Sequence, residues 1–229
     1  MKKYELSASD KRRCKTIDLR LLPWFDYKGR SFPWRRDSLT NYQYVVTEVL
    51  LQRTRAETVS AIFEGFFEQF PDWNALAAAE SEQLRRFLKP LGLWQRRAVT
   101  LHDLAIEMSS RGRNFPGDRN AVEELPGVGQ YIANAIELLI HGKPMPLLDT
   151  NMARVIERYF RPRVLADIRY DPWLQEITTH LVRISRDPIK LNWAILDLGA
   201  MVCLSRKPSC CTCPLRRGCS YRAVSNIEK

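Results

Sequence analysis

Residues 125–136 read LPGVGQYIANAI, and this stretch decides the fold. Gly127 and Gly129 bracket a valine, and apolar residues then recur at helical spacing. Glycine adopts positive φ readily and lets the backbone come close to a ligand, and the unpaired amides at the start of a helix suit a phosphate. With a helix on each side of the turn, the stretch indicates a helix–hairpin–helix with a phosphate-binding turn.

Helical periodicity also dominates the chain on both sides of the hairpin. Apolar residues repeat at steps of three and four, and no segment shows convincing strand alternation. The sequence therefore predicts an all-α fold with short loops. The aromatic and basic segment 22–37, LPWFDYKGRSFPWRRD, is expected to be an irregular lead-in. The expected helices are 42–55, 59–70, 82–89, 94–108, 132–140, 150–160, 172–184 and 190–203.

The charge of the chain favours a polyanionic partner. Its 229 residues carry 36 Lys and Arg against 26 Asp and Glu, which gives a net charge of +10. Neutralising phosphates releases counterions, so a basic surplus suits nucleic acid, although the same surplus could serve solubility alone. No run approaches the roughly 20 apolar residues of a membrane span, and the basic N-terminus lacks the apolar stretch of a signal peptide. The expected location is the cytoplasm.

The cysteines are concentrated near the C-terminus. Five of the six lie between Cys203 and Cys219, whereas a disulfide framework would spread them over the chain. The pattern C-x6-C-x2-C-x5-C can hold one cubane cluster or one tetrahedral ion. Zinc sites more often pair two short knuckles across a longer loop, and only Cys210 and Cys213 form such a knuckle here. Cys211 is interpreted as a bystander. The predicted ligands are Cys203, Cys210, Cys213 and Cys219.

An aspartate follows the hairpin after one helix and a turn. Asp149 lies in LLDTNMARVIERYF, residues 147–160, where a further helix is expected to begin. Its side chain is suited to cap that helix by accepting from the first free amides. Without further context, a helix cap is the interpretation of Asp149.

The order of these motifs (hairpin, helix, aspartate, helix, four cysteines) resembles the helix–hairpin–helix (HhH-GPD) DNA glycosylase superfamily with an iron–sulfur cluster. The resemblance runs roughly from Trp34 to Cys219. It implies two all-α lobes, a six-helix barrel over 34–143 and an iron–sulfur lobe that joins 1–33 to 144–229. It also implies a structural [4Fe–4S] cluster rather than zinc, and a monomer that binds double-stranded DNA across the cleft between the lobes.

The same resemblance gives Asp149 a catalytic role, stabilising the cationic sugar as the N-glycosidic bond breaks. Endonuclease III carries a lysine at the position of Tyr131, and its amine leads to strand cleavage through a Schiff base. Tyr131 cannot form that imine, so the enzyme should be monofunctional and leave an abasic site for an AP endonuclease. MutY carries a serine there and the Mig-type thymine glycosylases a tyrosine, so Tyr131 favours excision of thymine from G·T mismatches.

Base recognition is expected in VTEVLLQRTRAETV, residues 46–59, which is similar to a helix that both MutY and Mig-type enzymes carry. Glu48 matches their pocket glutamate, which can hydrogen-bond or protonate a flipped base, and would complete the catalytic set of Asp149, Glu48 and Tyr131. The alternative for Glu48 is an exposed surface glutamate. Its apolar neighbours favour burial.

Flipping a base leaves a gap in the stack and an orphan partner. The resemblance places Gln52 and Arg53 in the duplex, with Arg53 donating to the orphan guanine, and makes Leu93 or Trp94 the wedge. For Trp94, an anchor in the core is an equal alternative. The hairpin would hold phosphates, and its carbonyls could hold a monovalent cation, as in the family. The expected DNA-binding residues are Gln52, Arg53, Leu93, Trp94, Gly127, Gly129 and Gln130.

Two alternatives to thymine excision are kept. A MutY-type adenine glycosylase, acting on adenine opposite guanine or 8-oxoguanine, fits Glu48 but not Tyr131 or the LDTN at 148–151. The short stretch after Cys219 is also expected to leave no room for the extra domain by which MutY proteins recognise 8-oxoguanine. A catalytically silent DNA-binding module of the same fold is the lesser alternative. Uracil opposite guanine fits a thymine pocket, and the expected place of action is nucleoid DNA in a prokaryotic cytoplasm.

Overall fold

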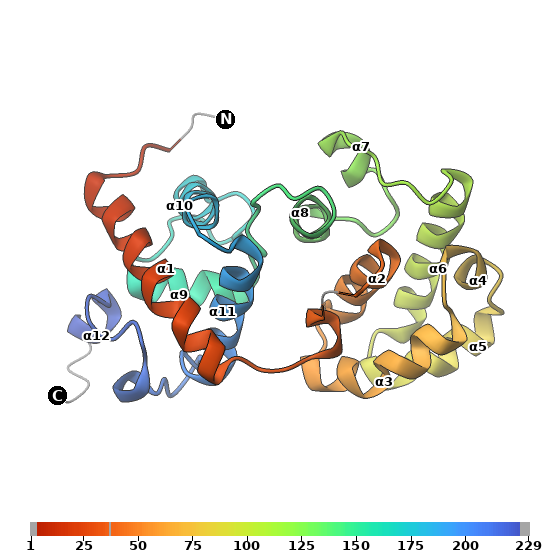
Figure 1. Ribbon diagram of the computed structural model, residues 1–229, viewed down its shortest axis with the longest axis horizontal. Helices are drawn as coiled ribbons and strands as arrows, with labels where there is room; N and C mark the ends of the chain where they lie inside the picture. The colour runs from red at the N-terminus through yellow and green to blue at the C-terminus, as the bar shows by residue number, and fades with distance from the viewer. Residues whose placement is uncertain (1–3, 37, 225–229) are drawn as a thin grey trace. The chain divides into compact units, whose positions relative to one another are not determined.

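The computed structural model describes residues 4–36 and 38–224, and within these ranges every regular element is a helix (Figure 1). The expected all-α fold is therefore confirmed. The chain divides into two compact units. One is formed by residues 31–141, here called the hairpin unit, and the other by residues 1–30 with 142–229, here called the cysteine unit. Each unit has its own hydrophobic core.

The hairpin unit is built around the long helix α6. This helix packs against α2, α4 and α5, and α2 packs in turn against α3 and α8. The hairpin itself lies between the short helix α7 and α8. The elements are η1 (Pro33–Arg35), α2 (Asn41–Leu51), α3 (Ala56–Gln69), α4 (Trp73–Ala77), α5 (Ser81–Leu88), η2 (Lys89–Leu91), α6 (Trp94–Ser110), α7 (Arg119–Glu123) and α8 (Gln130–Leu139).

Aromatic side chains fill the core of the hairpin unit. The rings of Phe66 and Phe67 on α3 meet edge to face with centroids 5.3 Å apart. The ring of Tyr42 on α2 lies 4.7 Å from that of Trp73, and its hydroxyl donates to the carbonyl of Phe70 at 2.7 Å. The buried phenol thus keeps a hydrogen-bond partner, as buried polar groups require. The repeat of apolar residues predicted for α3 is the face that enters this core.

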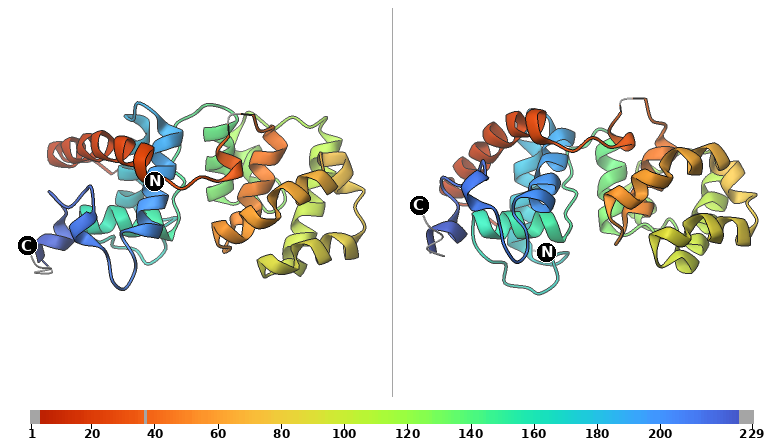
Figure 2. Two further views of the ribbon diagram at one scale, coloured as in Figure 1. Left: turned by 60° about the horizontal axis from the view of Figure 1, so that its bottom comes forward. Right: turned by 90° about the horizontal axis from the view of Figure 1, so that it is seen from below.

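The cysteine unit packs α1 against α10 and α11, and α9 against the same two helices (Figure 2). Aspartate side chains cap three of these helices: Asp149 caps α9, Asp171 caps α10 and Asp187 caps α11. A proline occupies the first turn of α10 and of α11, where a missing amide costs nothing. The elements are α1 (Ala8–Lys28), α9 (Thr150–Tyr159), α10 (Pro172–Arg183), α11 (Pro188–Met201), η3 (Cys210–Thr212) and α12 (Ser220–Val224).

The prediction of an irregular lead-in over 22–37 is wrong for its N-terminal part, because residues 22–28 form the last two turns of α1. Leu21 and Leu22 are buried in the core of the cysteine unit, and this burial carries the helix past Pro23. The helix ends at Gly29, whose amide donates to the carbonyl of Phe25 at 2.8 Å. A side chain at Gly29 would place its Cβ 2.5 Å from that oxygen, so glycine fits the turn.

The helix predicted over 42–55 is too long by four residues, since α2 ends at Leu51. Arg53 has a φ of 54°, a left-handed conformation that cannot continue a right-handed helix. The guanidinium of Arg97 donates to the carbonyls of Leu50 at 3.0 Å and Gln52 at 2.9 Å. A contact from a helix distant in the sequence therefore ends α2.

Candidate active site

Asp149 lies at the N-cap of α9 in the cysteine unit. Its Oδ1 accepts from the amide of Met152 at 2.7 Å, so the expected helix cap is confirmed. Its Oδ2 accepts from the side-chain amide of Asn151 at 2.8 Å. Burial raises the pKa of Asp149, while the two hydrogen bonds and the charge of Arg154 oppose that rise. The result is a half-buried carboxylate held in one orientation, as stabilisation of a developing cation requires.

A hydrogen-bonded chain connects Asp149 to the cysteine-bearing loop. Asn151 Oδ1 accepts from Arg154 Nη2 at 2.9 Å, and Arg154 Nε donates to the carbonyl of Cys203 at 2.8 Å. Arg154 also donates to the carbonyl of Gly199 on α11 at 2.7 Å. The sequence analysis gave no role to Arg154 and included Asn151 only as the last residue of the LDTN motif. The available signal was their spacing of one helical turn, directly after the aspartate.

The segment that leads to Asp149 is fixed by a fully buried asparagine of α11. Asn192 Oδ1 accepts from the amide of Leu147 at 2.7 Å. Its Nδ2 donates to the carbonyls of Met145 at 3.2 Å and Pro188 at 2.8 Å. Every polar atom of this side chain is thus used, and the backbone entering Asp149 is held against α11.

The hairpin turn takes the left-handed conformation expected of its glycines at Gly127 but not at Gly129, whose φ is −95°. Gly127 has a φ of 73°, and a Cβ there would lie 2.1 Å from Cγ2 of Thr100 on α6. Glycine is therefore required twice, by the left-handed turn and by the close approach of α6. Gly129 is the N-cap of α8, and no side chain caps this helix. The N-terminus of α8, which begins at Gln130, carries the partial positive charge that favours an anion.

An arginine of α7 holds the two helices of the hairpin together. Arg119 Nη1 donates to Asn134 Oδ1 and to Glu137 Oε2, both at 2.7 Å, and both of these residues are buried on α8. Arg119 Nη2 reaches the carbonyl of Gln130 at 3.4 Å. The start of α8 is therefore fixed by charge-assisted hydrogen bonds as well as by packing.

Glu48 and Tyr131 both belong to the hairpin unit, on α2 and α8, two helices that pack against each other. Glu48 is only 5% exposed, so the alternative of an exposed surface glutamate is wrong. Tyr131 is half-buried in the first turn of α8 and packs against the core of the unit. Asp149 belongs to the cysteine unit.

The segments expected to enter DNA have an unusual backbone. Arg53 and Leu93 have φ values of 54° and 47°, although neither is a glycine. Leu93 is 60% exposed, and Gln52 and Arg53 are exposed as well. Trp94 is half-buried and packs against the core, which favours its reading as an anchor of α6. Leu93 is the better candidate for the wedge.

The four cysteines of the predicted cluster follow α11. Cys203 lies just beyond that helix, Cys210 begins η3, Cys213 follows it, and Cys219 precedes α12. Three of them, Cys203, Cys213 and Cys219, pack against the core of the cysteine unit. Burial raises the pKa of the Cys213 thiol to about 11, and the charges of the other three add to the rise.

Arginine side chains fix the backbone around these sulfur atoms. Arg158 donates to Sγ of Cys203 at 3.5 Å and to the carbonyls of Leu204 at 2.6 Å and Ser205 at 2.7 Å. Arg13 of α1 donates to the carbonyl of Gly218 at 2.8 Å. Among the described residues, no three His, Cys, Asp or Glu side chains are arranged to hold a single metal ion. The charges of Cys203 and Cys219 act on the thiols of both Cys210 and Cys213, and Arg158 adds positive charge beside Cys210.

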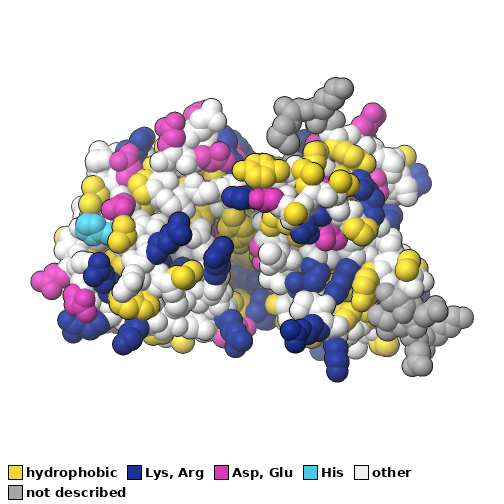
Figure 3. Space-filling view, turned by 180° about the vertical axis from the view of Figure 1, so that it is seen from behind, with side chains coloured by type: hydrophobic (Ala, Val, Ile, Leu, Met, Phe, Trp, Pro, Cys, Tyr) yellow, Lys and Arg dark blue, Asp and Glu magenta, His cyan; other side chains and the backbone are white. Residues whose placement is uncertain are grey.

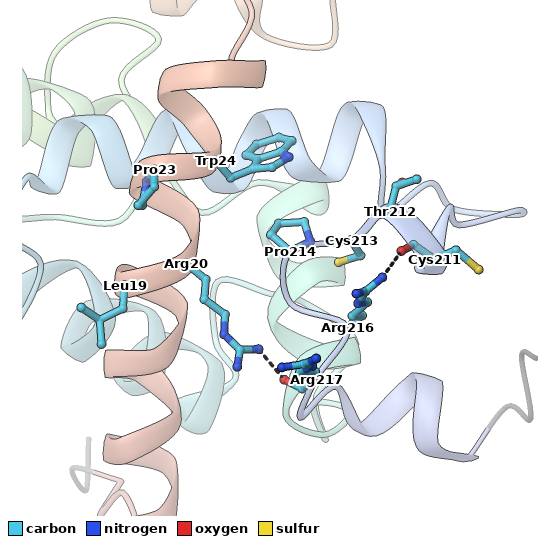
Figure 4. A pocket seen from close by; sticks show the side chains of 10 residues that line it. All are labelled: Leu19, Arg20, Pro23, Trp24, Cys211, Thr212, Cys213, Pro214, Arg216 and Arg217. Carbon is cyan, nitrogen blue, oxygen red and sulfur yellow. Dashed lines mark hydrogen bonds between the residues drawn. The ribbon is translucent and has the colours of Figure 1, made fainter. Parts of the chain in front are cut away.

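A pocket of about 700 Å³ lies between α1 and the cysteine loop (Figure 4). Arg20 donates to the carbonyl of Arg217 at 2.9 Å, and Arg216 donates to the carbonyl of Cys211 at 2.8 Å. The exposed thiol of Cys211 points away from that of Cys213, which agrees with its interpretation as a bystander. The arginines that line this pocket therefore hold the backbone of residues 211–217 through hydrogen bonds to its carbonyls.

Basic side chains are numerous on the surface, as the face in Figure 3 shows in dark blue. They account for the net charge of +10 that favours a polyanionic partner. None of the helices within residues 4–36 and 38–224 has the length and apolarity that crossing a membrane requires.

Comparison with known proteins bears on this geometry. The chain is 35% identical over 216 residues to the thymine-DNA glycosylase of Aeropyrum pernix, covering 93% of this chain and 96% of that protein. It is 33% identical to the thymine/uracil-DNA glycosylase of Methanothermobacter thermautotrophicus, again over 93% and 96%. It is 32% identical to the adenine DNA glycosylase of Mycolicibacterium smegmatis, over 89% of this chain but 69% of that protein.

The fold and a family model agree with these relatives. The structure of a thermostable thymine-DNA glycosylase matches with a TM-score of 0.84 and 31% identity, covering 95% of this chain and 99% of that one. The model of the HhH-GPD superfamily base excision DNA repair proteins matches residues 46–165, which include the hairpin and Asp149. The resemblance drawn from the motifs is confirmed, and the chain belongs to the HhH-GPD superfamily of base excision DNA repair proteins.

Proposed function

We propose that the protein is a monofunctional DNA glycosylase that hydrolyses the N-glycosidic bond of thymine, and of uracil, opposite guanine in double-stranded DNA. The observation that carries the proposal is the Asp149 carboxylate, fixed by Met152 and Asn151 at the start of α9. The relatives named thymine-DNA and thymine/uracil-DNA glycosylase support the choice of base. The basic surface supports DNA as the partner.

In this proposal, Asp149 acts on the sugar. As the bond to the base breaks, positive charge develops on the deoxyribose, and an ionised carboxylate at a fixed distance stabilises it. Hydrogen bonds from Met152 and Asn151 favour the ionised form and prevent the side chain from turning away. The same carboxylate is suited to orient the water that attacks the sugar.

Glu48 and Tyr131 are proposed to receive the flipped base. The buried carboxyl of Glu48 on α2 can hydrogen-bond or protonate a pyrimidine, and the half-buried phenol of Tyr131 on α8 can form a wall or donate its hydroxyl. Uracil differs from thymine by lacking one methyl group, so a pocket for thymine also admits uracil.

The enzyme is proposed to lack lyase activity, because Tyr131 has no amine with which to attack the sugar. The product is then an intact strand with an abasic site, on which an AP endonuclease would act. Action as a monomer, on nucleoid DNA in the cytoplasm, is part of the same proposal.

DNA is proposed to contact the hairpin unit at two places. The amides of α8, with Gly127, Gly129 and Gln130, hold backbone phosphates, and a monovalent cation at the hairpin carbonyls is a further prediction. Arg53 donates to the orphan guanine and Leu93 fills the gap in the stack, with Gln52 beside them.

Cys203, Cys210, Cys213 and Cys219 are proposed to hold a [4Fe–4S] cluster. Bound there, such a cluster would cross-link a loop that has few helical hydrogen bonds of its own, which is a structural contribution. Arg13 and Arg158 hold the surrounding carbonyls, so the chain already shapes the loop that the thiolates would close.

Adenine excision is the second candidate, because the relatives include an adenine DNA glycosylase and buried Glu48 could protonate adenine. A panel of labelled duplexes with G·T, G·U, G·A and 8-oxoguanine·A pairs, treated with alkali after incubation, separates the candidates. Cleavage at thymine and uracil supports the proposal, and cleavage at adenine alone favours the MutY type. No cleavage of any duplex would leave only the silent DNA-binding module, and strand cleavage without alkali would contradict the absence of lyase activity.

A matched pair of variants assigns the chemistry. Asp149→Asn keeps an oxygen for the Met152 amide but loses the charge, and should bind mismatched DNA without excision. Asp187→Asn makes the same change at the N-cap of α11, where Asp187 accepts from the Lys190 amide at 2.9 Å, and should keep full activity. Equal activity of the two variants would refute the role of Asp149.

A further inference from the structure

The two exposed turns of the hairpin unit that are proposed to enter DNA share a backbone strain. Arg53, after α2, has a φ of 54°, and Leu93, before α6, has a φ of 47°. Side chains other than glycine adopt this region at a cost, because Cβ approaches the following carbonyl oxygen. Such strain persists only where surrounding contacts hold it. The left-handed conformations of Arg53 and Leu93 therefore depend on contacts from the rest of the hairpin unit.

One residue contacts both turns. Arg97 lies in the first turn of α6 and is 6% exposed. Its backbone amide donates to the carbonyl of Leu93 at 3.0 Å. Its guanidinium donates to the carbonyls of Val49, of Leu50 at 3.0 Å and of Gln52 at 2.9 Å.

Thr54 closes the connection from the other side. Its hydroxyl accepts from Arg97 Nη2 at 2.9 Å and donates to the carbonyl of Leu91 at 3.1 Å. Leu91 ends η2, directly before the Gly92–Leu93 turn. The two turns are thus joined through Arg97 and Thr54, although they lie about forty residues apart in the chain.

Arginine is the residue type suited to this position. The carbonyls at the end of α2 carry partial negative charge, which a cation stabilises, and only that of Val49 also accepts from the C-cap amide of Gln52, at 3.4 Å, among the three that Arg97 contacts. The planar guanidinium presents several donors in fixed directions and can serve these separate acceptors at once. A lysine would carry the same charge on one ammonium group, which could not donate to all of these carbonyls and to the Thr54 hydroxyl together.

We propose that Arg97 is a positioning residue for DNA insertion. It holds the turn with Gln52 and Arg53 and the turn with Leu93 as one rigid pair before DNA arrives. The duplex then meets preformed elements, and no free energy is lost in ordering two loops on binding. The proposal rests on the proposed function, since it concerns how that glycosylase opens a mismatch.

The test compares Arg97→Lys with Arg96→Lys, a matched change at the exposed neighbouring position of α6. Both are made in the Asp149→Asn background, so that binding is read without chemistry. The probe is a G·T duplex with 2-aminopurine beside the mismatched thymine, whose fluorescence rises on unstacking. We expect Arg97→Lys to need roughly tenfold more protein for half of the fluorescence rise, because small displacements of positioned groups have large effects. Arg96→Lys should match the parent.

A second readout separates positioning from loss of fold. In protein that keeps Asp149, Arg97→Lys should need a higher enzyme concentration to reach half of its maximal single-turnover rate of excision. The maximal rate itself should fall by a smaller factor than that concentration rises. If Arg97→Lys fails to fold, Thr54→Val takes its place, since it keeps the shape and removes only the hydroxyl. It should shift half-saturation by about threefold in the same direction.

The outcomes are distinct for the two proposals. If wild-type protein excises no base from any duplex of the panel, the proposed function fails. If it excises thymine but a folded Arg97→Lys protein matches Arg96→Lys in fluorescence and half-saturation, Arg97 serves the fold alone and the positioning role is overturned.

Discussion

Asn151 donates its side-chain amide to Oδ2 of Asp149 at 2.8 Å, while the amide of Met152 occupies Oδ1 at 2.7 Å. The two donors come from the first turn of the helix that Asp149 itself caps. Asn151 is in turn fixed by Arg154, which reaches the carbonyl of Cys203. The orientation of the proposed catalytic carboxylate therefore depends on residues of its own helix and on the loop that bears the cysteines.

Asn151→Ala should slow excision and shift its pH dependence. The substitution removes the Asn151 hydrogen bond, which lowers the pKa of Asp149. Burial, which raises this pKa, is then opposed less strongly, so the pKa should rise further. Because the reaction needs the ionised carboxylate, the acidic limb of the single-turnover rate should move to higher pH. The rate above that limb should fall by roughly tenfold through lost orientation.

Measurement of single-turnover excision against pH checks this expectation. Asn74→Ala, at an exposed position of α4 in the hairpin unit, controls for the loss of an asparagine side chain. An unchanged pH profile for Asn151→Ala would show that Met152 alone fixes the carboxylate.

Asp149→Asn should not destabilise the protein at neutral pH. Burial raises the pKa of Asp149, so the folded chain binds this proton more tightly than the unfolded chain does. Its favourable contribution to the free energy of unfolding is present at low pH and is lost as the pH rises through the folded pKa. The asparagine is neutral throughout and can still cap α9, so its Tm should equal or exceed that of the wild type at neutral pH. Thermal unfolding followed by circular dichroism measures this, and a large fall in Tm would contradict it.

Gly127→Ala should weaken both stability and DNA binding. The added methyl would lie 2.1 Å from Thr100 Cγ2 and would occupy a left-handed conformation. Overpacking together with backbone strain should lower the free energy of unfolding by about 2–4 kcal/mol. Thr100→Ser removes the clashing methyl, so the double variant should recover part of the stability while keeping the backbone strain. Urea unfolding of the single and double variants measures this recovery. If the losses in free energy of unfolding of the two single variants simply add in the double variant, the Thr100 methyl is not what the side chain added by Gly127→Ala clashes with.

Tyr131→Lys should introduce lyase activity if the side chain faces the sugar as proposed. A lysine there would supply the amine that forms a Schiff base, and the strand would then break without alkali. Borohydride should trap a covalent protein–DNA adduct with this variant and not with the wild type. Lys143, which lies beyond α8, is the control, because Lys143→Arg should leave the wild-type behaviour unchanged. An adduct with wild-type protein would contradict the assignment.

Cys213→Ser should abolish the proposed cluster, whereas Cys211→Ser should leave it intact. Purified wild-type protein should show a broad absorbance near 400 nm, as expected of the iron–sulfur members of the family, and should contain about four iron atoms per chain. Loss of a thiolate that packs against the core should also lower Tm, because metal binding is coupled to folding of the loop. A colourless wild-type protein that contains zinc would refute the cluster.

Much of the fold could be predicted from the sequence because it depends on local patterns. The apolar repeat of α3, the glycines of the hairpin and the aspartate at the start of α9 each act within a few residues of themselves. The spacing of the cysteines, and the presence of tyrosine rather than lysine at position 131, are likewise known from the sequence alone. These local features were sufficient for the all-α class and for the superfamily.

Only the tertiary structure decided how these parts are held. The end of α2 depends on Arg97, which lies more than forty residues later, and the orientation of Asp149 depends on Arg154 and the carbonyl of Cys203. Carbonyl acceptors belong to every residue, so the sequence contains no mark of which ones a side chain will reach. The burial of Glu48 and the left-handed turns at Arg53 and Leu93 arise in the same way, from packing between helices that are distant in the chain.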